Sequence, residues 1–333
     1  MIDSIPTLLT GALIGMAMGL MVKLPVAWLI VRFKQTRLGQ NPAVRKSVDA
    51  ALEKNVSHMV AVLSAPSKTD SQQPEISAKQ AFAEIRRVAN EGGQETTKGD
   101  ETELERLQRI AEQGGASAQH MLGRLYYLGT GVSQSYETAT HWFRLSAEQG
   151  YAPAQFSLGN LYHTGKKGPI DYESAEKWYR LSAEQGYAPA QHNMGNLYYF
   201  GHGVSPDYQE AAKWLRFAAE QGIALAQYNL GVMYSTGKGV TPDPKEAAKW
   251  LRAAAERGHS LAQYNLGAMY GRGEGVPQNY IYAHMWLSLA ASSGDKHSGV
   301  ARDAVAALMI PEQIADAQKL AAECLKNDYK GCP

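Results

Sequence analysis

Apolar residues recur at helical spacing in two consecutive segments that begin at residue 116. In the first segment, residues 116–128, one helical face carries Ala118, Leu122, Leu125 and Tyr126. In the second, residues 135–149, the same spacing joins Ala139, Trp142, Phe143, Ser146 and Ala147. Glycine follows each segment, at Gly129 and Gly150, and glycine takes the left-handed conformation of a helix C-cap without penalty. The pattern predicts two helices, helix A and helix B, joined by a short turn.

This helix pair returns four more times with a period of 36 residues. In helix A the period links Gly123, Gly159, Gly195, Gly231 and Gly267. In helix B it links Trp142, Trp178, Trp214, Trp250 and Trp286. A fixed period of about 20 to 50 residues is typical of solenoids and related repeat arrays. We therefore expect an all-α fold, a right-handed α-solenoid of five helix-turn-helix repeats over residues 116–294.

The repeated glycines and tryptophans are expected to form the structural core of the repeats. A glycine inside a helix costs up to about 1 kcal/mol relative to alanine, so its return in every repeat calls for a compensating contact. The simplest contact is a close approach of the neighbouring helix, which places the tryptophan ring beside the glycine. Burial of a tryptophan removes about 150 to 250 Å² of surface from water, and this gain exceeds the glycine penalty.

An uncharged apolar segment, residues 5–22, precedes the repeats. It is long enough for a helix that crosses a thin bilayer, and we predict a transmembrane anchor over residues 1–36. A cleavable signal peptide is the alternative, but the segment lacks a basic N-terminal region and a convincing small-residue cleavage site. Asp3 is the only charged residue before the span, whereas the basic residues Arg32, Lys34, Arg37, Arg45 and Lys46 follow it. The positive-inside rule then predicts that the repeats face the cytoplasm, with the periplasm as the alternative.

Three glycines of this predicted span, Gly11, Gly15 and Gly19, fall on one helical face. Small residues at this spacing allow two membrane helices to approach closely, so they predict homo-oligomers through the membrane. The alternative is that glycine is simply frequent in membrane helices. The remaining segments are predicted as follows: a juxtamembrane amphipathic helix at 37–63, a flexible linker at 64–77, degenerate N-terminal cap helices at 78–115, and C-terminal capping helices with a tail at 295–333.

The repeated residues form the pattern A-Q-x-x-L-G-x-L-Y, then G-x-G-V, then A-x-x-W, then A-A-E-Q-G. This pattern resembles the Sel-one-like repeat, of the suppressor and enhancer of Lin type, which is related to the tetratricopeptide repeat. The resemblance covers residues 116–294 as five units. One departure is visible at residues 165–169, where Gly-Lys-Lys-Gly-Pro replaces Gly-x-Gly-Val. The resemblance implies an α-solenoid used in protein assembly, signalling or quality control, and leaves the partner open.

Charge and composition narrow the possible functions. Lys plus Arg (33) nearly balances Asp plus Glu (32), so nucleic acid is not expected as a partner. The two cysteines, Cys324 and Cys332, lie outside the repeats, and could form one disulfide in an oxidising compartment. No metal-binding, phosphate-binding or paired-carboxylate motif appears among the residues. We therefore expect no enzyme activity, no metal and no cofactor.

A variable column on helix A is the candidate binding groove. The frame of the repeat is constant, but the positions predicted to project away from the core differ between units. In the first three units these candidate residues are Arg124 and Tyr127, Asn160 and His163, and Asn196 and Tyr199. The alternative is a solvated face that is free to vary. The sequence thus predicts a membrane-anchored scaffold that binds other proteins or peptides. A periplasmic cell-envelope factor or a regulatory subunit associated with an enzyme is the alternative.

Overall fold

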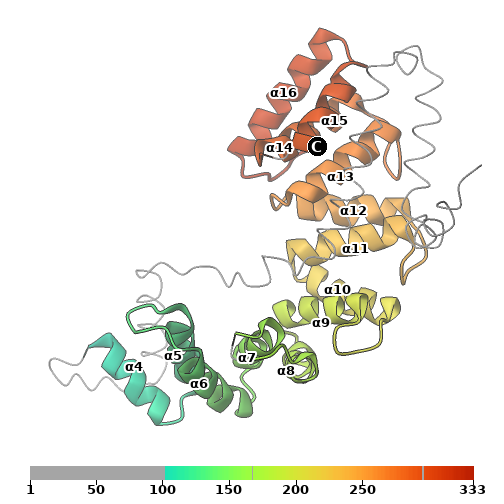
Figure 1. The fold of residues 1–333 in the computed structure, drawn as a ribbon. Coiled ribbons are helices and arrows are strands. Elements are labelled where there is room, and N and C mark those ends of the chain that lie inside the picture. The colour runs from blue at the N-terminus through green and yellow to red at the C-terminus, as the bar shows by residue number, and fades with distance from the viewer. Residues whose placement is uncertain (1–101, 167, 295) are drawn as a thin grey trace, which may run out of the picture. The chain divides into compact units, whose positions relative to one another are not determined.

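The computed structural model describes residues 102–166, 168–294 and 296–333, and these residues form thirteen α-helices and no strand (Figure 1). The predicted transmembrane helix, with Gly11, Gly15 and Gly19, lies outside the described residues. So do the predicted juxtamembrane helix at 37–63, the linker at 64–77 and the first part of the N-terminal cap. Of the helices that are described, none combines the length and the apolar character needed to cross a membrane.

The described residues belong to two compact units. The N-terminal unit holds residues 102–233 and 238–241, and the C-terminal unit holds residues 234–237 and 242–333. The helices of the N-terminal unit are α4 (Glu103–Glu112), α5 (Ala116–Leu128), α6 (Tyr136–Glu148), α7 (Ala152–Thr164), α8 (Tyr172–Glu184), α9 (Ala188–Phe200), α10 (Tyr208–Glu220) and most of α11 (Ala224–Thr236). Those of the C-terminal unit are α12 (Pro244–Ala255), α13 (Ser260–Arg272), α14 (Tyr280–Ser292), α15 (Lys296–Ala306) and α16 (Pro311–Lys326).

In the N-terminal unit the helices pack in chain order. Helix α6 packs on α5 of its own repeat and on α7 of the next one, and α8 packs in the same way on α7 and α9. Helix α4, which precedes the first repeat, packs on α5 and buries Leu107 and Ala111. Contact with the preceding and the following element is the stacking of a tandem-repeat, solenoid-like fold. The predicted helix pairs are confirmed.

The turns between the paired helices are built from the residues that the sequence repeats. Gly129, Gly165 and Gly201 take left-handed backbone conformations at the C-caps of α5, α7 and α9. At the start of the next helix, the Asp171 and Asp207 carboxylates accept hydrogen bonds from backbone N–H groups of α8 and α10. The hydrogen bonds from Ser174 hold the pKa of Asp171 below its usual value. A glycine that ends one helix and an acceptor that begins the next make a short, reproducible turn.

The repeated glycines do mark a close approach between the two helices of a repeat. A Cβ atom placed on Gly123 would lie 2.6 Å from the Phe143 ring, and one on Gly195 would lie 2.6 Å from Leu215 Cγ. Phe143 and Leu215 each come directly after the repeated tryptophan. The prediction that the tryptophan ring fills this space is therefore wrong, because the next residue along helix B points at the glycine. All five glycines are buried, as the packing requires.

The tryptophans instead connect one repeat to the repeat before it. Trp142 packs against a cluster that contains residues of both α4 and α5, including Leu107 and Leu122. Trp214 belongs to a cluster that joins α8 to α9 through Tyr179 and Met194. Trp214 and Trp286 are buried, whereas Trp142, Trp178 and Trp250 are half-buried. The tryptophans thus contribute to the core as predicted, but three of them at its edge.

The C-terminal unit ends in two helices and a tail that folds back. Helix α14 packs on both α15 and α16, and Trp286 on α14 is completely buried. The Trp286 Nε1 donates to the Pro333 carbonyl at 3.1 Å, and Arg252 donates to the Cys332 carbonyl at 3.2 Å. Cys324 and Cys332 form a disulfide, and both are buried. The tail is therefore part of the packed structure of this unit.

Candidate protein-binding surface

The six predicted groove residues lie on α5, α7 and α9 of the N-terminal unit. Asn160 is only 8% exposed. The other five, Arg124, Tyr127, His163, Asn196 and Tyr199, are half-buried. The expectation that this column projects away from the core is therefore wrong for Asn160, and the rest of the column lies at the margin of the core.

Asn160 and Asn196 are buried or half-buried because they connect successive A helices. Asn160 Oδ1 accepts hydrogen bonds from Tyr179 Oη at 2.5 Å and from Asn193 Nδ2 at 3.2 Å. Asn196 Oδ1 accepts from Asn229 Nδ2 at 3.3 Å. The two bonds between asparagines join α7 to α9 and α9 to α11, and the bond from Tyr179 joins α8 to α7. A polar group so deep in a core stabilises the fold only when it is paired, and these side chains pair with one another.

The buried His192 links these two contacts into one chain of hydrogen bonds. Its Nδ1 lies 3.2 Å from Asn193 Oδ1, and its Nε2 lies 3.2 Å from Asn196 Nδ2. The sequence did not indicate this network, because its members belong to three different repeats and do not occupy one common position of the repeat. A pair such as Asn160 and Asn193 becomes visible only when the helices are placed side by side.

A second set of contacts forms at the turns, and we call its three groups the turn clusters. Each group combines an aromatic ring near the end of helix A, a tyrosine at the start of helix B and a lysine or histidine side chain from the turn of the next repeat. The first turn cluster is Tyr127, Tyr136 and Lys166; the second is His163, Tyr172 and His202; the third is Tyr199, Tyr208 and Lys238. Three of the six predicted groove residues, Tyr127, His163 and Tyr199, therefore occupy the same place in successive clusters.

The first and third turn clusters hold a lysine over two tyrosine rings. Lys166 Nζ lies 4.6 Å from the Tyr127 ring centroid and donates to its hydroxyl at 2.7 Å. Lys238 Nζ lies 5.2 Å from the Tyr199 ring centroid and 5.3 Å from that of Tyr208. These are cation–π distances, and each ammonium group keeps donors beyond those used on tyrosine. Within the part of the chain that the structure describes, no carboxylate forms an ion pair with either lysine.

In the second turn cluster, His202 takes the place that a lysine has in the other two clusters. The His202 ring stacks on Tyr172 with 4.8 Å between centroids and an interplanar angle of 15°. The ring centroids of His163 and Tyr172 lie 5.4 Å apart. Beside this cluster the Phe200 ring, which is 37% exposed, also stacks on His202. Together with Tyr208, which is 40% exposed, Phe200 gives this side of the unit an accessible aromatic surface.

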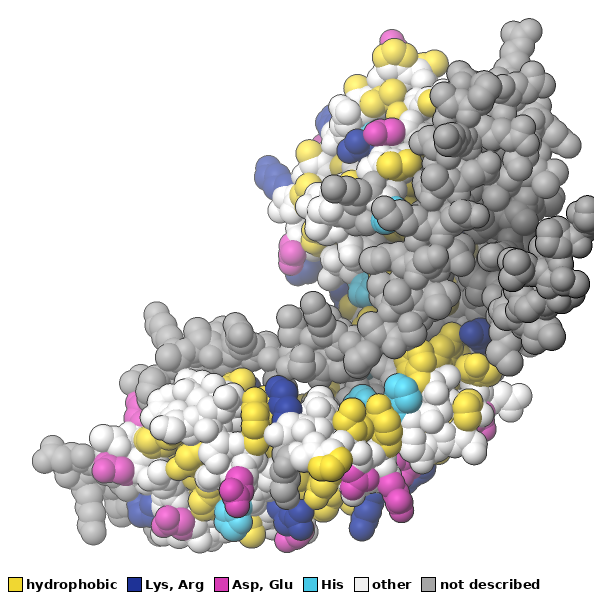
Figure 2. Space-filling view, in the orientation of Figure 1, with side chains coloured by type: hydrophobic (Ala, Val, Ile, Leu, Met, Phe, Trp, Pro, Cys, Tyr) yellow, Lys and Arg dark blue, Asp and Glu magenta, His cyan; other side chains and the backbone are white. Residues whose placement is uncertain are grey.

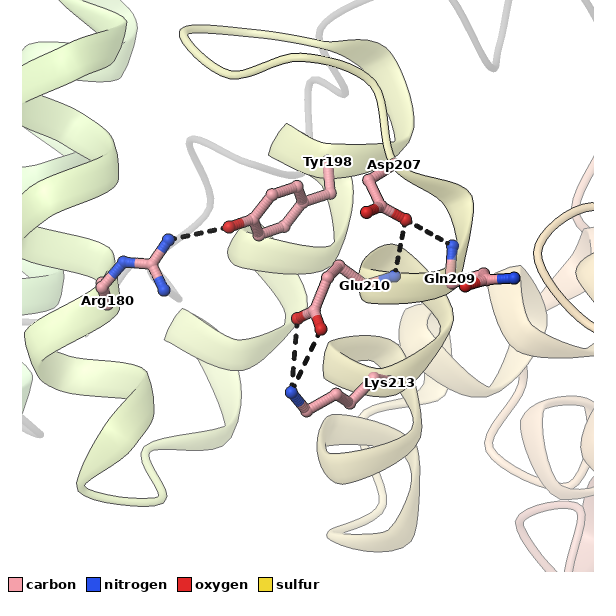
Figure 3. A network of polar contacts seen from close by, with 6 residues as sticks. All are labelled: Arg180, Tyr198, Asp207, Gln209, Glu210 and Lys213. Atoms are coloured by element: carbon pink, nitrogen blue, oxygen red, sulfur yellow. Dashed lines mark hydrogen bonds and ion pairs between the residues drawn. The ribbon is translucent and has the colours of Figure 1, made fainter.

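Other repeated polar contacts belong to the frame. Arg180 on α8 donates to the Tyr198 hydroxyl on α9 at 2.8 Å, as Figure 3 shows, and Arg144 donates to Tyr162 in the same way at 2.9 Å. The repeated Ala-Gln pairs also act between repeats, since Gln155 Nε2 donates to the Ala147 carbonyl at the end of α6. Tyr162 and Tyr198, which end the A-Q-x-x-L-G-x-L-Y part of the repeat pattern, thus carry a specific hydrogen bond at each of these repeat boundaries.

In the N-terminal unit, the acidic side chains of the helix pairs lie on the B helices and not on the A helices. Helices α5, α7, α9 and α11 contain no Asp or Glu, whereas α6, α8 and α10 each contain both acidic and basic residues. In Figure 2 most magenta carboxylates of the N-terminal unit lie along its lower side together with dark blue side chains, and along its upper side cyan and dark blue side chains lie among yellow ones. The turn clusters therefore adjoin a helix layer that is rich in aromatic groups and free of acidic ones.

His120 on α5 is a titratable group with a strongly lowered pKa. Burial, with a smaller contribution from the positive charge of Arg124, lowers its pKa to about 3. Its ring lies 5.5 Å from both Phe143 and Tyr151, and its Nε2 lies 3.0 Å from Ser157 Oγ. A neutral imidazole at this interface between repeats is consistent with a structural role. In the described ranges, no three His, Cys, Asp or Glu side chains are grouped so that they could hold a metal ion.

Comparison with known proteins agrees with the repeat architecture. The Sel1 repeat matches five times, at residues 116–151, 152–187, 188–223, 224–259 and 260–295. A Sel1 repeat protein from Oxalobacter formigenes is 30% identical with a TM-score of 0.59; the alignment covers 72% of this chain and 94% of that one. The protective antigen c5321 of uropathogenic Escherichia coli strains, which has an SLR fold, is 28% identical with a TM-score of 0.50. That alignment covers 76% of this chain and spans only 62% of the antigen.

No curated protein matches the chain in sequence. The family is nevertheless established by the repeats, because they cover more than half of the 333 residues and coincide with the helix pairs of the structure. The chain belongs to the Sel1 repeat family.

Proposed function

We propose that this protein is a membrane-anchored scaffold that binds partner proteins at the turn clusters of its N-terminal unit. Sel1 repeat proteins are generally scaffolds for protein–protein interactions. The observation that carries the proposal is the recurrence of the clusters: three successive repeats each present two aromatic rings and a basic or imidazole group at the same turn. Aromatic side chains with a polar end are enriched where proteins bind one another.

The proposed binding surface differs in position from the variable column on helix A that the sequence predicts. Asn160 and Asn196 are engaged between helices, so they support the surface but are not offered to a partner. The accessible groups are instead Phe200, Tyr208 and the lysines over the tyrosine rings. A partner that covers them would bury aromatic surface at the centre of its contact, which is where binding energy concentrates.

Membrane attachment is the second part of the proposal. It is supported by the 18 uncharged residues at 5–22 and by the basic residues that follow them. The basic residues favour a cytoplasmic position for the repeats. The disulfide between Cys324 and Cys332 favours the alternative, a cell-envelope factor in the oxidising periplasm, because cytosolic thiols are normally kept reduced.

Affinity capture with the detergent-solubilised full chain tests the binding surface. The test variant is Phe200→Ala with Tyr208→Ala, and the matched control is Leu181→Ala with Phe217→Ala on the B helices. Leu181 and Phe217 are 39% and 41% exposed, close to the 37% and 40% of the test pair. The proposal requires that the test variant loses partners that the control retains. Equal capture by wild type and both variants would place binding elsewhere.

Fusion reporters test the topology. Alkaline phosphatase fused after Pro333 is active only if Pro333 lies in the periplasm. A fluorescent protein fused after Pro333 is bright only if Pro333 lies in the cytoplasm, because it does not fold when it is exported unfolded. A bright and phosphatase-negative pair supports the cytoplasmic position. Active phosphatase supports the periplasmic alternative, and solubility of the full chain without detergent would contradict the anchor itself.

A further inference from the structure

We infer that the turn clusters bind an extended acidic segment of the partner, with one carboxylate group per repeat; this inference rests on the proposed scaffold function and names the chemistry of its ligand. The first support is the set of cations. Lys166 and Lys238 are half-buried against tyrosine rings, and no carboxylate among the described residues pairs with them. A partly desolvated ammonium group is stabilised by a counter-ion that the described part of the chain does not supply.

The second support is the absence of Asp and Glu from the A helices, whereas the exposed carboxylates of Glu137 and Glu173, which follow cluster tyrosines in the sequence, lie on the B helices. The adjoining A helices contain no Asp or Glu, so a carboxylate at the clusters would meet no like charge from them. The two aspartates near the clusters, Asp171 and Asp207, direct their carboxylates to backbone N–H groups at the starts of α8 and α10. An acidic partner would meet both lysines at the clusters, whereas a basic partner would meet the same two positive charges and be repelled by them.

The third support is the spacing. One hydrogen bond joins α7 to α9 and another joins α9 to α11, so successive A helices lie side by side, and packed helices lie about 8–10 Å apart. Extended or polyproline-like chains advance about 3.1–3.4 Å per residue, so three residues cover about one repeat. An extended peptide with a carboxylate at every third residue would therefore present one carboxylate each to Lys166, His202 and Lys238.

The aromatic rings set the conformation of the ligand that fits. Phe200 stacks on His202 and is partly exposed, and Tyr208 is exposed beside Lys238. Flat exposed rings accept proline and other apolar residues placed between the carboxylates. The ligand class is thus an acidic segment in an extended conformation with proline or apolar residues between its carboxylates, and an amphipathic helix does not match this spacing.

Fluorescence anisotropy with synthetic probes tests this inference on the detergent-solubilised full chain. The first probe is a labelled peptide that repeats Glu-Pro-Ser four times. The second replaces every Glu by Gln, and the third has the same composition with its four Glu residues adjacent. We expect the first probe to bind at least about tenfold more tightly than the other two, and to weaken as the salt concentration rises.

Variants locate the binding. Lys166→Gln with Lys238→Gln should weaken binding of the first probe about tenfold, because charge-assisted contacts are the stronger ones. The matched control is Lys177→Gln with Lys213→Gln, which removes the same charge from exposed positions of α8 and α10 and should stay within about twofold of wild type. Thermal melts of both variants show whether the fold is intact, and His202→Gln provides a second test at the middle cluster.

Several results would overturn the inference: no binding of the first probe, equal binding of the Glu and Gln probes, or equal loss in the test and control variants. Equally tight binding to phosphatidylserine vesicles or to single-stranded DNA would show a general affinity for anions instead. The capture experiment separates this failure from failure of the scaffold proposal. If Phe200 and Tyr208 are needed for capture but the probes do not bind, the surface is a binding site and its ligand is not acidic.

Discussion

Gly159 on α7 lies directly against the ring of Tyr179 on α8, so that a Cβ atom on Gly159 would lie 2.6 Å from Tyr179 Cδ1. The ring is completely buried, and its hydroxyl donates to Asn160 Oδ1. Tyr179 is therefore held at both its ring and its hydroxyl, and it has little freedom to move away. The repeated glycine is required by this contact, and its helix penalty is offset by the ring that it admits.

The Gly159→Ala substitution should therefore destabilise the fold. Alanine improves helix propensity by up to about 1 kcal/mol, but overpacking against a fixed ring costs about 1–3 kcal/mol. The matched control is Gly271→Ala in α13, where the added Cβ would lie 3.8 Å from Ala283 Cβ in ordinary contact. The control should be neutral or slightly stabilising. Urea unfolding of both variants measures the difference, and a stabilised Gly159→Ala would contradict the packing described here.

The Trp214→Ala substitution should destabilise the fold by about 3–5 kcal/mol, as a large truncation inside a core does. Trp214 is 7% exposed and packs between α8 and α9, and in the described part of the structure its Nε1 has no hydrogen-bond partner. The loss is thus one of packing. Phe217→Ala, which removes a neighbouring ring that is 41% exposed, should cost much less. Similar melting temperatures for the two variants would show that the buried and exposed faces of α10 are reversed.

The Asn160→Ala substitution should lower stability by about 1–3 kcal/mol, although Asn160 was predicted to line a groove. It would remove the oxygen to which both the Tyr179 hydroxyl and the Asn193 amide donate, and of these two groups the Tyr179 hydroxyl keeps a contact with His163 Nδ1 at 3.3 Å. A double-mutant cycle with Tyr179→Phe tests the contact, since removal of both partners should cost less than the sum of the two single losses. Additive losses, or an unchanged melt for Asn160→Ala, would mean that the contact contributes nothing.

His120 predicts a pH dependence. Its pKa of about 3 in the folded state lies below the ordinary value of 6.5, so below pH 6.5 the unfolded chain binds a proton that the folded chain does not. The stabilising contribution is complete above pH 6.5 and is lost progressively as the pH falls toward 3. Because the ring is only half-buried, we expect about 1 kcal/mol between pH 6.5 and 5, about half of the full linkage value. Denaturant unfolding of wild type and His120→Gln measures it, and equal slopes against pH for both would rule this source out.

The sequence alone determined the repeat, its helix pairs and its turns, because these depend on local chemistry that recurs every 36 residues. Gly129 ends α5 and Ser135 begins the capping of α6 through interactions that span only a few residues. The close contact at Gly123 was also predictable, since a glycine that returns in every helix A must have a neighbour that requires it. The column of variable residues was found in the same way, and three of its members do occupy the turn clusters.

Only the tertiary structure decided which side chain meets which. The sequence could not show that Phe143, and not Trp142, faces Gly123, because adjacent residues of a helix differ by about 100° in direction and the rotation of one helix against another is set by the whole interface. For the same reason Asn160 proved to be an interior acceptor, since its burial depends on Tyr179 and Asn193 from neighbouring helices. Spacing along one chain defines the faces of a helix, whereas the choice between core and binding surface depends on what the next repeat places against each face.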